Sequence, residues 1–141
     1  MSTLDKAIQI AAKAHEGQMD RQGQPYILHP LRVMLHMQTN EGRIAAVLHD
    51  VVEDSTTTLD DLRQAGFTEF VVQAVDAVSR RDGEDYMDFV KRSAQNPLGK
   101  QIKLADLHDN MDLRRICTKT EKDQQRLERY HQAWLYLTRN P

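Results

Sequence analysis

Apolar residues recur three and four positions apart along most of this chain, which is the spacing of amphipathic helices. Leu4, Ile8 and Ala11 begin the pattern behind a Ser or Thr cap, and Gly17 is expected to end the first helix. Further helices are predicted over about 30–38, 43–53, 58–66, 68–78, 85–94, 98–114 and 120–138. No stretch alternates apolar and polar residues as a strand would. We therefore predict an all-α fold.

Individual residues indicate where several of these helices begin and which of them is buried. Pro30 is expected to be the first residue of its helix, where a missing N–H does no harm. Thr58 and Asp61 match the capping-box pattern, and Thr68 can cap the helix after it. The segment AAVLHDVV (45–52) is apolar on nearly every side, so we expect its helix at the centre of the fold.

Length and composition favour one ordinary globular domain, residues 1–141. The net charge is −2 and the pI is near 6.3, so the chain has no overall basic field. Binding to nucleic acid or to an anionic membrane is therefore not expected, and a small ligand is favoured. Residues 1–18 lack the continuous apolar segment of a signal peptide or a membrane span, so we expect a cytoplasmic protein. The oligomeric state stays open.

The clearest chemical signal is the segment LHDVVED (48–54). On a helix, offsets of three and four residues place Asp50 beside Glu53 and Asp54 at one end. Carboxyl groups that are buried together resist ionisation, because their negative charges would repel each other. A divalent cation offsets that repulsion. Cys117 is the one cysteine, so a metal site here must use nitrogen and oxygen ligands, which suit Mn²⁺, Fe²⁺, Zn²⁺ or Mg²⁺.

A lone His-Asp pair is weak evidence for a metal site, because it arises easily by chance. The chain contains a second pair, His108-Asp109, which we interpret as solvated or locally bonded side chains on a helix. The first pair, His49-Asp50, stands out because two acids follow it within one turn in apolar surroundings. Two further segments, HP at 29–30 and KLAD at 103–106, can complete a metal shell.

Four ordered motifs resemble the hydrolase domain of the RelA/SpoT alarmone proteins and the free-standing small alarmone hydrolases: AHEGQ (14–18), GQPYILHP (23–30), AAVLHDVVEDS (45–55) and IKLADLHDNM (102–111). The resemblance implies a single-domain HD-type helical bundle. It implies that one cation, usually Mn²⁺, is held by His29, His49, Asp50 and Asp106. The acidic pair Glu53 and Asp54 would position and deprotonate the attacking water. Family members remove the 3′-pyrophosphate from guanosine tetra- or pentaphosphate (ppGpp and pppGpp).

The same resemblance implies substrate contacts. Arg21 matches a phosphate-binding basic residue, Asn110 matches an asparagine that touches the nucleotide, and Arg126 and Tyr130 match a pair on the last helix. The family usually has a second basic residue, which stacks on guanine, where this chain has Asp20. Two alternatives therefore stay open. One is an HD phosphohydrolase of another nucleotide, such as an adenosine 3′-pyrophosphate analogue or a phosphorylated cofactor, and the other is a non-catalytic, metal-stabilised nucleotide sensor.

Other polar residues receive simpler interpretations. His15 and His36 are expected to be packed or half-exposed rather than ligands. Lys103 is equally compatible with a phosphate contact and with orienting an acid. Arg80 and Arg81 are surface charges by default, although one of them could reach a pyrophosphate from its loop.

Overall fold

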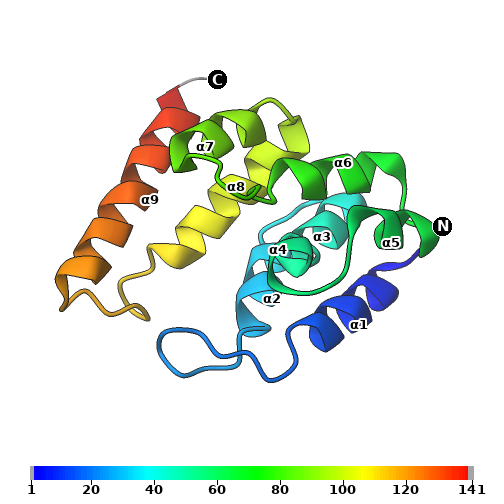
Figure 1. The fold of residues 1–141 in the computed structure, drawn as a ribbon, viewed down its shortest axis with the longest axis horizontal. Helices are drawn as coiled ribbons and strands as arrows, with labels where there is room; N and C mark the ends of the chain where they lie inside the picture. Colours follow the sequence, from blue (N-terminus) through cyan, green and yellow to red (C-terminus); the bar gives the residue numbers. More distant parts are fainter. Residues whose placement is uncertain (1, 140–141) are drawn as a thin grey trace.

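The computed structural model describes residues 2–139, and the regular secondary structure in that part of the chain is helical (Figure 1). Its helices are α1 (Leu4–Ala14), α2 (Leu28–Leu35), α3 (Asn40–Val47), α4 (Val51–Asp54), α5 (Leu59–Gln64), α6 (Glu69–Ala77), α7 (Tyr86–Ala94), α8 (Pro97–Asn110) and α9 (Glu121–Arg139). The predicted all-α fold is confirmed. Across residues 2–139, no helix combines the length and apolar character that a bilayer crossing requires.

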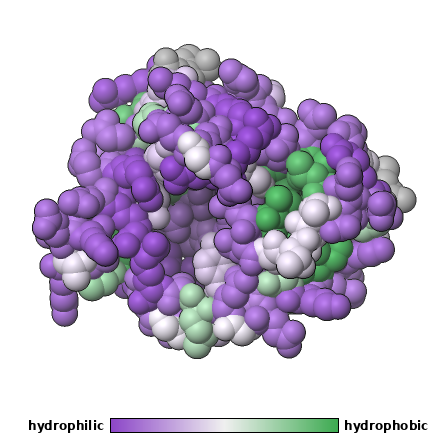
Figure 2. Space-filling view, in the orientation of Figure 1, coloured by the Kyte–Doolittle hydropathy of each residue, from purple (hydrophilic) through white to green (hydrophobic). Residues whose placement is uncertain are grey.

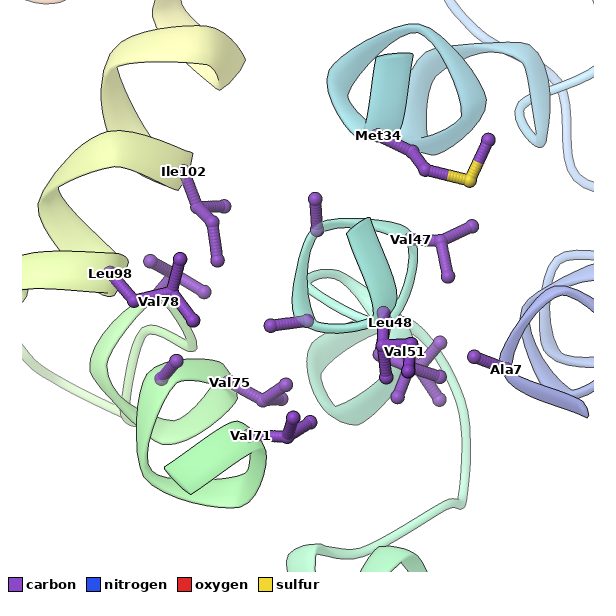
Figure 3. Packing of buried hydrophobic residues seen from close by; sticks show 14 of the residues in the cluster. Ala7, Met34, Val47, Leu48, Val51, Val71, Val75, Val78, Leu98 and Ile102 are labelled. Atoms are coloured by element: carbon purple, nitrogen blue, oxygen red, sulfur yellow. The ribbon is translucent and has the colours of Figure 1, made fainter. Parts of the chain in front are cut away.

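Helix α3 lies at the centre of the main hydrophobic core, with α1, α2, α6 and α8 packed around it (Figure 3). Side chains from each of these neighbours point toward it, including Met34, Val75 and Ile102. Val47 and Leu48 have no exposed surface, which confirms the predicted burial of the 45–52 segment. Truncating a leucine such as Leu48 to alanine in such a core costs about 2–5 kcal/mol.

A second, smaller hydrophobic cluster joins α7, α8 and α9. Its fully buried members are Val90, Leu107, Ala133 and Leu137, and partly buried aromatic side chains surround them. Helix α8 supplies residues to both clusters, because Ile102 faces the main core while Leu107 faces α7 and α9. This central position lets α8 carry polar side chains to the boundary between the two clusters.

The predicted continuous helix over 43–53 is wrong, because the chain turns at residues 48–50 between α3 and α4. In an α-helix the carbonyl of Ala46 would accept the N–H of Asp50. Instead it accepts the backbone N–H of His49 at 3.2 Å and the His49 Nδ1–H at 2.7 Å. The histidine side chain thus takes the carbonyl that helix continuation needs, and this break aims His49 and Asp50 into the interior.

Other helix boundaries differ more modestly from the predictions. Helix α2 begins at Leu28, so Pro30 is its third residue, where the N–H would still lack an intrahelical acceptor. Helix α8 ends at Asn110 rather than near residue 114, because the Asp112 carboxylate accepts the backbone N–H of Arg114 and favours a turn. The predicted capping box of Thr58 is confirmed.

Candidate functional site

Four residues predicted as metal ligands meet where α2, the α3–α4 turn and α8 approach one another. The Nε2 atom of His29 lies 2.9 Å from Asp106 Oδ1 and 3.7 Å from Asp50 Oδ2. The Nε2 atom of His49 lies 3.1 Å from Asp50 Oδ2 and 3.5 Å from Asp106 Oδ1. We call this group the His/Asp cluster (His29, His49, Asp50 and Asp106). Its donor atoms converge from segments almost eighty residues apart.

Hydrogen bonds to the far side of each ring determine which nitrogen points into the His/Asp cluster. The Nδ1 atom of His29 lies 2.6 Å from Asp109 Oδ2, and Nδ1 of His49 lies 2.7 Å from the Ala46 carbonyl. Both partners are acceptors, so each Nδ1 carries a proton and each Nε2 presents its lone pair when the ring is neutral. The Nε2 of His49 is buried without a hydrogen-bond partner. Such a nitrogen, facing carboxylates, fits a cation between them.

The electrostatics of the His/Asp cluster favour the same conclusion. Burial lowers the pKa of His29, but hydrogen bonds to Asp106 and Asp109 outweigh it and raise that pKa to about 9. Burial also lowers the pKa of His49, yet the charge of Asp50 moves it well above its usual value. Without a metal, the imidazoles would thus hold protons. A divalent cation would replace those protons, as metal binding to histidine generally does.

Within residues 2–139, the histidine, cysteine and acidic side chains that could hold a metal ion form one group, His29, His49 and Asp106, with donor atoms all within 4.8 Å of one another. Asp50 adjoins this group and is held by Tyr26, whose hydroxyl donates to Asp50 Oδ2 at 2.6 Å. Sequence reasoning missed Tyr26. It lies three residues before His29 in the same motif, and that proximity was the available signal.

Asp109 corrects the interpretation of the second His-Asp pair. His108 is exposed as expected, but Asp109 is buried and bonds to His29. It also accepts from Arg32 Nε at 2.7 Å and from Arg115 Nη2 at 3.1 Å. Carboxylates that hold a metal-binding histidine by its second nitrogen are common behind metal sites. The helical offset of three from Asp106 placed both acids on one face of α8 and could have revealed this role.

The two oxygens of Asp106 face different neighbours. Oδ2 accepts from the buried Lys103 ammonium at 2.9 Å, and Oδ1 accepts from Asn110 Nδ2 at 3.1 Å. The open question about Lys103 is therefore answered in favour of an acid partner. Burial raises the pKa of Asp106, but Lys103 and the two histidines hold it well below its usual value. The carboxylate is thus ionised and ready for a cation.

The predicted acidic pair, Glu53 and Asp54, stands at the end of α4 beside the His/Asp cluster. The Glu53 Oε1 atom accepts the backbone N–H of Arg80. Partial desolvation raises the pKa of Glu53 to about 7, and it also raises the pKa of Asp54, with the charge of Asp50 adding to both. A carboxylate with such a pKa can accept a proton near neutral pH.

The four residues predicted to bind substrate line one pocket. This pocket, which we call the adjoining pocket, is formed by Asp20, Arg21, Gln22, Asn110, Ile116, Cys117, Asp123, Arg126, Leu127 and Tyr130. Residues 20–22 therefore converge with a segment almost ninety residues later in the chain. Asn110 connects the two parts of the site, because it lines the pocket and also donates to Asp106. In the view of Figure 2 the surface is hollowed near the middle, and the residues around the hollow are mostly hydrophilic.

Asp20 stabilises the loop that forms one wall of this pocket. Its Oδ1 accepts the backbone N–H groups of Gln22 and Gln24, each at 2.9 Å, and so shapes the loop before α2. Its Oδ2 lies 4.0 Å from Arg115 Nη1. The pocket therefore contains a carboxylate, where the motif comparison led us to expect a basic side chain.

Known proteins with similar sequences include one domain family and several hydrolases. A family model for the HD domain matches residues 7–105. The chain is 32% identical over 120 residues to a guanosine-3′,5′-bis(diphosphate) 3′-pyrophosphohydrolase of Aquifex aeolicus, covering 77% of this chain and 17% of that protein. It is 38% identical over 97 residues to the bifunctional (p)ppGpp synthase/hydrolase SpoT of Escherichia coli, covering 66% and 14%. The chain thus spans about a sixth of the length of these relatives.

A solved structure agrees with the fold and covers nearly the whole chain. It is described as a metazoan ortholog of SpoT that hydrolyzes ppGpp and plays a role in starvation responses. The TM-score is 0.81 at 25% sequence identity, and the match covers 99% of this chain and 87% of that one. The predicted resemblance to RelA/SpoT-type and small alarmone hydrolases, and the HD-type bundle that it implied, are confirmed.

Proposed function

This chain belongs to the HD domain family, and we propose that it is a metal-dependent phosphohydrolase that removes the 3′-pyrophosphate from guanosine tetra- or pentaphosphate. The observation that carries the proposal is the position of Asn110. It links a pocket lined by two arginines to a buried cluster of imidazoles and carboxylates. A nucleotide in the adjoining pocket could therefore present a phosphoryl group directly to the His/Asp cluster. The names of the relatives support this substrate class.

We assign one divalent cation, Mn²⁺ or another, to His29, His49, Asp50 and Asp106. The unpartnered Nε2 of His49, the outward-held Nδ1 atoms and the two ionised carboxylates support this assignment. When bound, such a cation supplies a Lewis acid that polarises a phosphoryl oxygen and offsets developing negative charge. Lys103 and Asn110 hold the Asp106 carboxylate by both oxygens, and Tyr26 holds that of Asp50, so the ligands are oriented in advance.

In the proposed reaction a water oxygen attacks the phosphorus bonded to the nucleotide 3′-oxygen. Glu53 takes the proton from that water, and Asp54 lies behind it as a second acid. The Arg80 N–H holds Glu53 Oε1, which leaves Oε2 to face the water. The bond between phosphorus and the 3′-oxygen breaks, the 3′-oxygen gains a proton, and pyrophosphate departs. The nucleotide product is GDP or GTP.

Arg21, Asn110, Arg126 and Tyr130 are proposed to hold the nucleotide itself. Arg126 is already oriented by Asp123, whose carboxylate lies 3.1 Å from its Nη1. The carboxylate of Asp20 in the same pocket favours a second candidate, an HD phosphohydrolase that accepts another nucleotide, including adenosine analogues. A carboxylate cannot stack on the base as a cationic side chain can, so Asp20 is expected to weaken the base discrimination that such stacking gives.

A release assay tests the function. Phosphate and pyrophosphate are measured over a panel of guanosine and adenosine 3′-phosphates and 3′-pyrophosphates with Mn²⁺ present. Release of pyrophosphate from guanosine tetraphosphate is expected, and the matched control is Glu53→Gln, which keeps the acceptor for Arg80. Binding without release from any compound would overturn the enzyme and favour the nucleotide sensor. Release from adenosine compounds alone would favour the second candidate.

Three further predictions belong with this proposal. Residues 1–141 are proposed to act as one domain, because α8 contributes to both hydrophobic clusters and ties α7 and α9 to the main core. A cytoplasmic location is proposed because the proposed substrate is a free nucleotide, a class of molecule found in the cytoplasm. Small-molecule nucleotides are the proposed partners, with neither nucleic acid nor membrane involved.

A further inference from the structure

Two arginines near Lys103, which are Arg80 and Arg129, have no carboxylate partner among residues 2–139. Most arginines in residues 2–139 pair with an acid, as Arg81 does with Asp76 at 3.5 Å and Arg92 with Glu84 at 2.9 Å. By contrast, the guanidinium groups of Arg80 and Arg129 have no carboxylate within 4.0 Å among these residues. Arg80 Nε donates to the backbone carbonyl of Glu84 at 3.0 Å, which leaves its two Nη groups for an anion.

These two arginines meet at one aromatic ring. The guanidinium carbon of Arg129 lies 4.6 Å from the ring centre of Tyr86, and that of Arg80 lies 5.6 Å from the same centre. Arg129 belongs to α9, whereas Arg80 lies in the loop between α6 and α7. The fold therefore brings two positive charges from separate segments to one aromatic ring. An anion that reaches both guanidinium groups is attracted by each of them.

The Tyr86 hydroxyl adds a donor at the same place. Its oxygen is buried and makes no hydrogen bond with any described residue. A buried hydroxyl without a partner costs free energy, so a native structure that keeps one usually reserves it for a ligand or a water. At neutral pH the phenol is protonated and can donate. A phosphate oxygen is an acceptor of the right kind.

The place is close to the proposed reaction centre. The Lys103 ammonium lies 2.9 Å from Asp106 Oδ2 and 5.5 Å from the Tyr86 ring centre, so it is near both. The backbone of Arg80 is bonded to Glu53, the proposed base. Asn110 and the adjoining pocket lie at the other oxygen of Asp106. The adjoining pocket thus lies near one oxygen of Asp106, and Lys103 and the Tyr86 ring lie near the other.

We propose that Arg80, Arg129 and the Tyr86 hydroxyl bind the distal phosphate of the 3′-pyrophosphate group. This inference rests on the proposed function, since it names the place that receives the group to be removed. The guanidinium groups would give the site a preference for a diphosphate over a single phosphate, because a diphosphate has a second phosphate group for them to bind. They also hold the pyrophosphate product until it dissociates.

Binding of inorganic pyrophosphate tests the inference without turnover. Titration calorimetry in EDTA compares the wild type with Arg80→Gln and Arg129→Gln, and each variant is expected to bind pyrophosphate about tenfold more weakly. Arg81→Gln and Arg139→Gln are the matched controls, because they remove neighbouring arginines from the same loop and the same helix. Tyr86→Phe keeps the ring and removes the hydroxyl, and a loss of about fivefold is expected.

Turnover separates this inference from the proposed function. With a guanosine 3′-pyrophosphate and the corresponding 3′-monophosphate as substrates, Arg129→Gln should raise the KM of the first by about tenfold and leave the second unchanged. Unchanged pyrophosphate affinity in both arginine variants would overturn the subsite while leaving the proposed function intact. In another outcome, the wild type hydrolyses no nucleotide but the two arginine variants still bind pyrophosphate more weakly than it does. That result would overturn the proposed function and keep the anion site.

Discussion

The His/Asp cluster and the adjoining pocket differ in how firmly their side chains are held. In the cluster, each imidazole is fixed from behind and each carboxylate is held by a neighbouring donor, as Tyr26 holds Asp50. In the pocket, Arg21 has no acidic partner among residues 2–139, and a turn-rich segment between α8 and α9 forms one wall. The comparison indicates that chemistry is set by packed helices and specificity by loops, so each can change without the other.

Removing a carboxylate from the His/Asp cluster should have the largest effect. Asp50→Ala is expected to lose most bound Mn²⁺ and nearly all activity, because one of the two charged ligands disappears. Elemental analysis of protein purified from Mn²⁺-containing buffer measures the metal. Chelation should lower the melting temperature of the wild type, since metal at a hundred times its Kd stabilises the fold by about 2.7 kcal/mol.

The matched control is Asp60→Ala, which removes an exposed aspartate from α5. It should keep about one cation per chain and respond to chelation as the wild type does. If Asp50→Ala also keeps one cation at unchanged affinity, the ligand assignment is wrong. Asp106→Ala is a less direct test because it strands the buried Lys103, at a cost of about 3–5 kcal/mol.

The second prediction removes the base and leaves the metal. Glu53→Gln keeps an oxygen for the Arg80 N–H but cannot take a proton, so turnover should fall by about 10²- to 10⁴-fold. Metal content and nucleotide affinity should match the wild type. Glu41→Gln, on the exposed start of α3, serves as the control. Single-turnover rates that do not differ between Glu53→Gln and the wild type would remove Glu53 from the mechanism.

The third prediction concerns the outer support of the His/Asp cluster. Asp109→Asn keeps the size of the side chain but replaces the carboxylate that accepts from His29 Nδ1–H with a neutral amide. Affinity for Mn²⁺ should fall by about 10- to 100-fold, and saturating metal should restore most of the activity. Competition with a chelating dye gives the affinity, and Asp112→Asn in the following turn is the control. An unchanged Mn²⁺ affinity would show that Asp109 serves the fold alone.

The sequence predicted the helical fold because its apolar spacing and its caps agree with the packing that formed. Thr58 illustrates this agreement, since both halves of its capping box are present. The break at His49 could not be predicted from apolar spacing. It depends on one side-chain nitrogen taking the Ala46 carbonyl, and nothing in the pattern of hydrophobic residues records that competition.

The site was predictable where motifs carried it and hidden where only the tertiary fold creates it. His29, His49, Asp50 and Asp106 were found from motifs, and the fold brings them together. Asp109 looked like half of a chance dipeptide, because its partner His29 is 80 residues away in the chain. The proposed anion subsite at Tyr86 was partly hidden. The sequence suggested Arg80 or Arg81 for a pyrophosphate but not Arg129, since α9 approaches α7 only in the folded protein.

The smallest expected effect concerns Asp20, where the family resemblance led us to expect a basic side chain. Asp20→Asn keeps a side-chain oxygen for the backbone N–H groups of Gln22 and Gln24 but removes a negative charge from a site that receives phosphates. The KM for guanosine tetraphosphate should fall by about two- to fivefold, which is the effect of one partly exposed charge. Asp20→Arg is a rougher test, because arginine offers no acceptor to the loop.

Base preference is the measurement that decides what Asp20 does, and kcat/KM for the guanosine and adenosine 3′-pyrophosphates must be compared at one Mn²⁺ concentration. In the wild type we expect less than about a tenfold preference, or about 1.4 kcal/mol of differential transition-state binding, since no cation at position 20 can stack on the base. Asp20→Asn should improve both substrates alike, because the removed repulsion acts on their shared phosphates. A wild-type guanine preference above about a hundredfold that survives this substitution would mean that other residues of the adjoining pocket recognise the base.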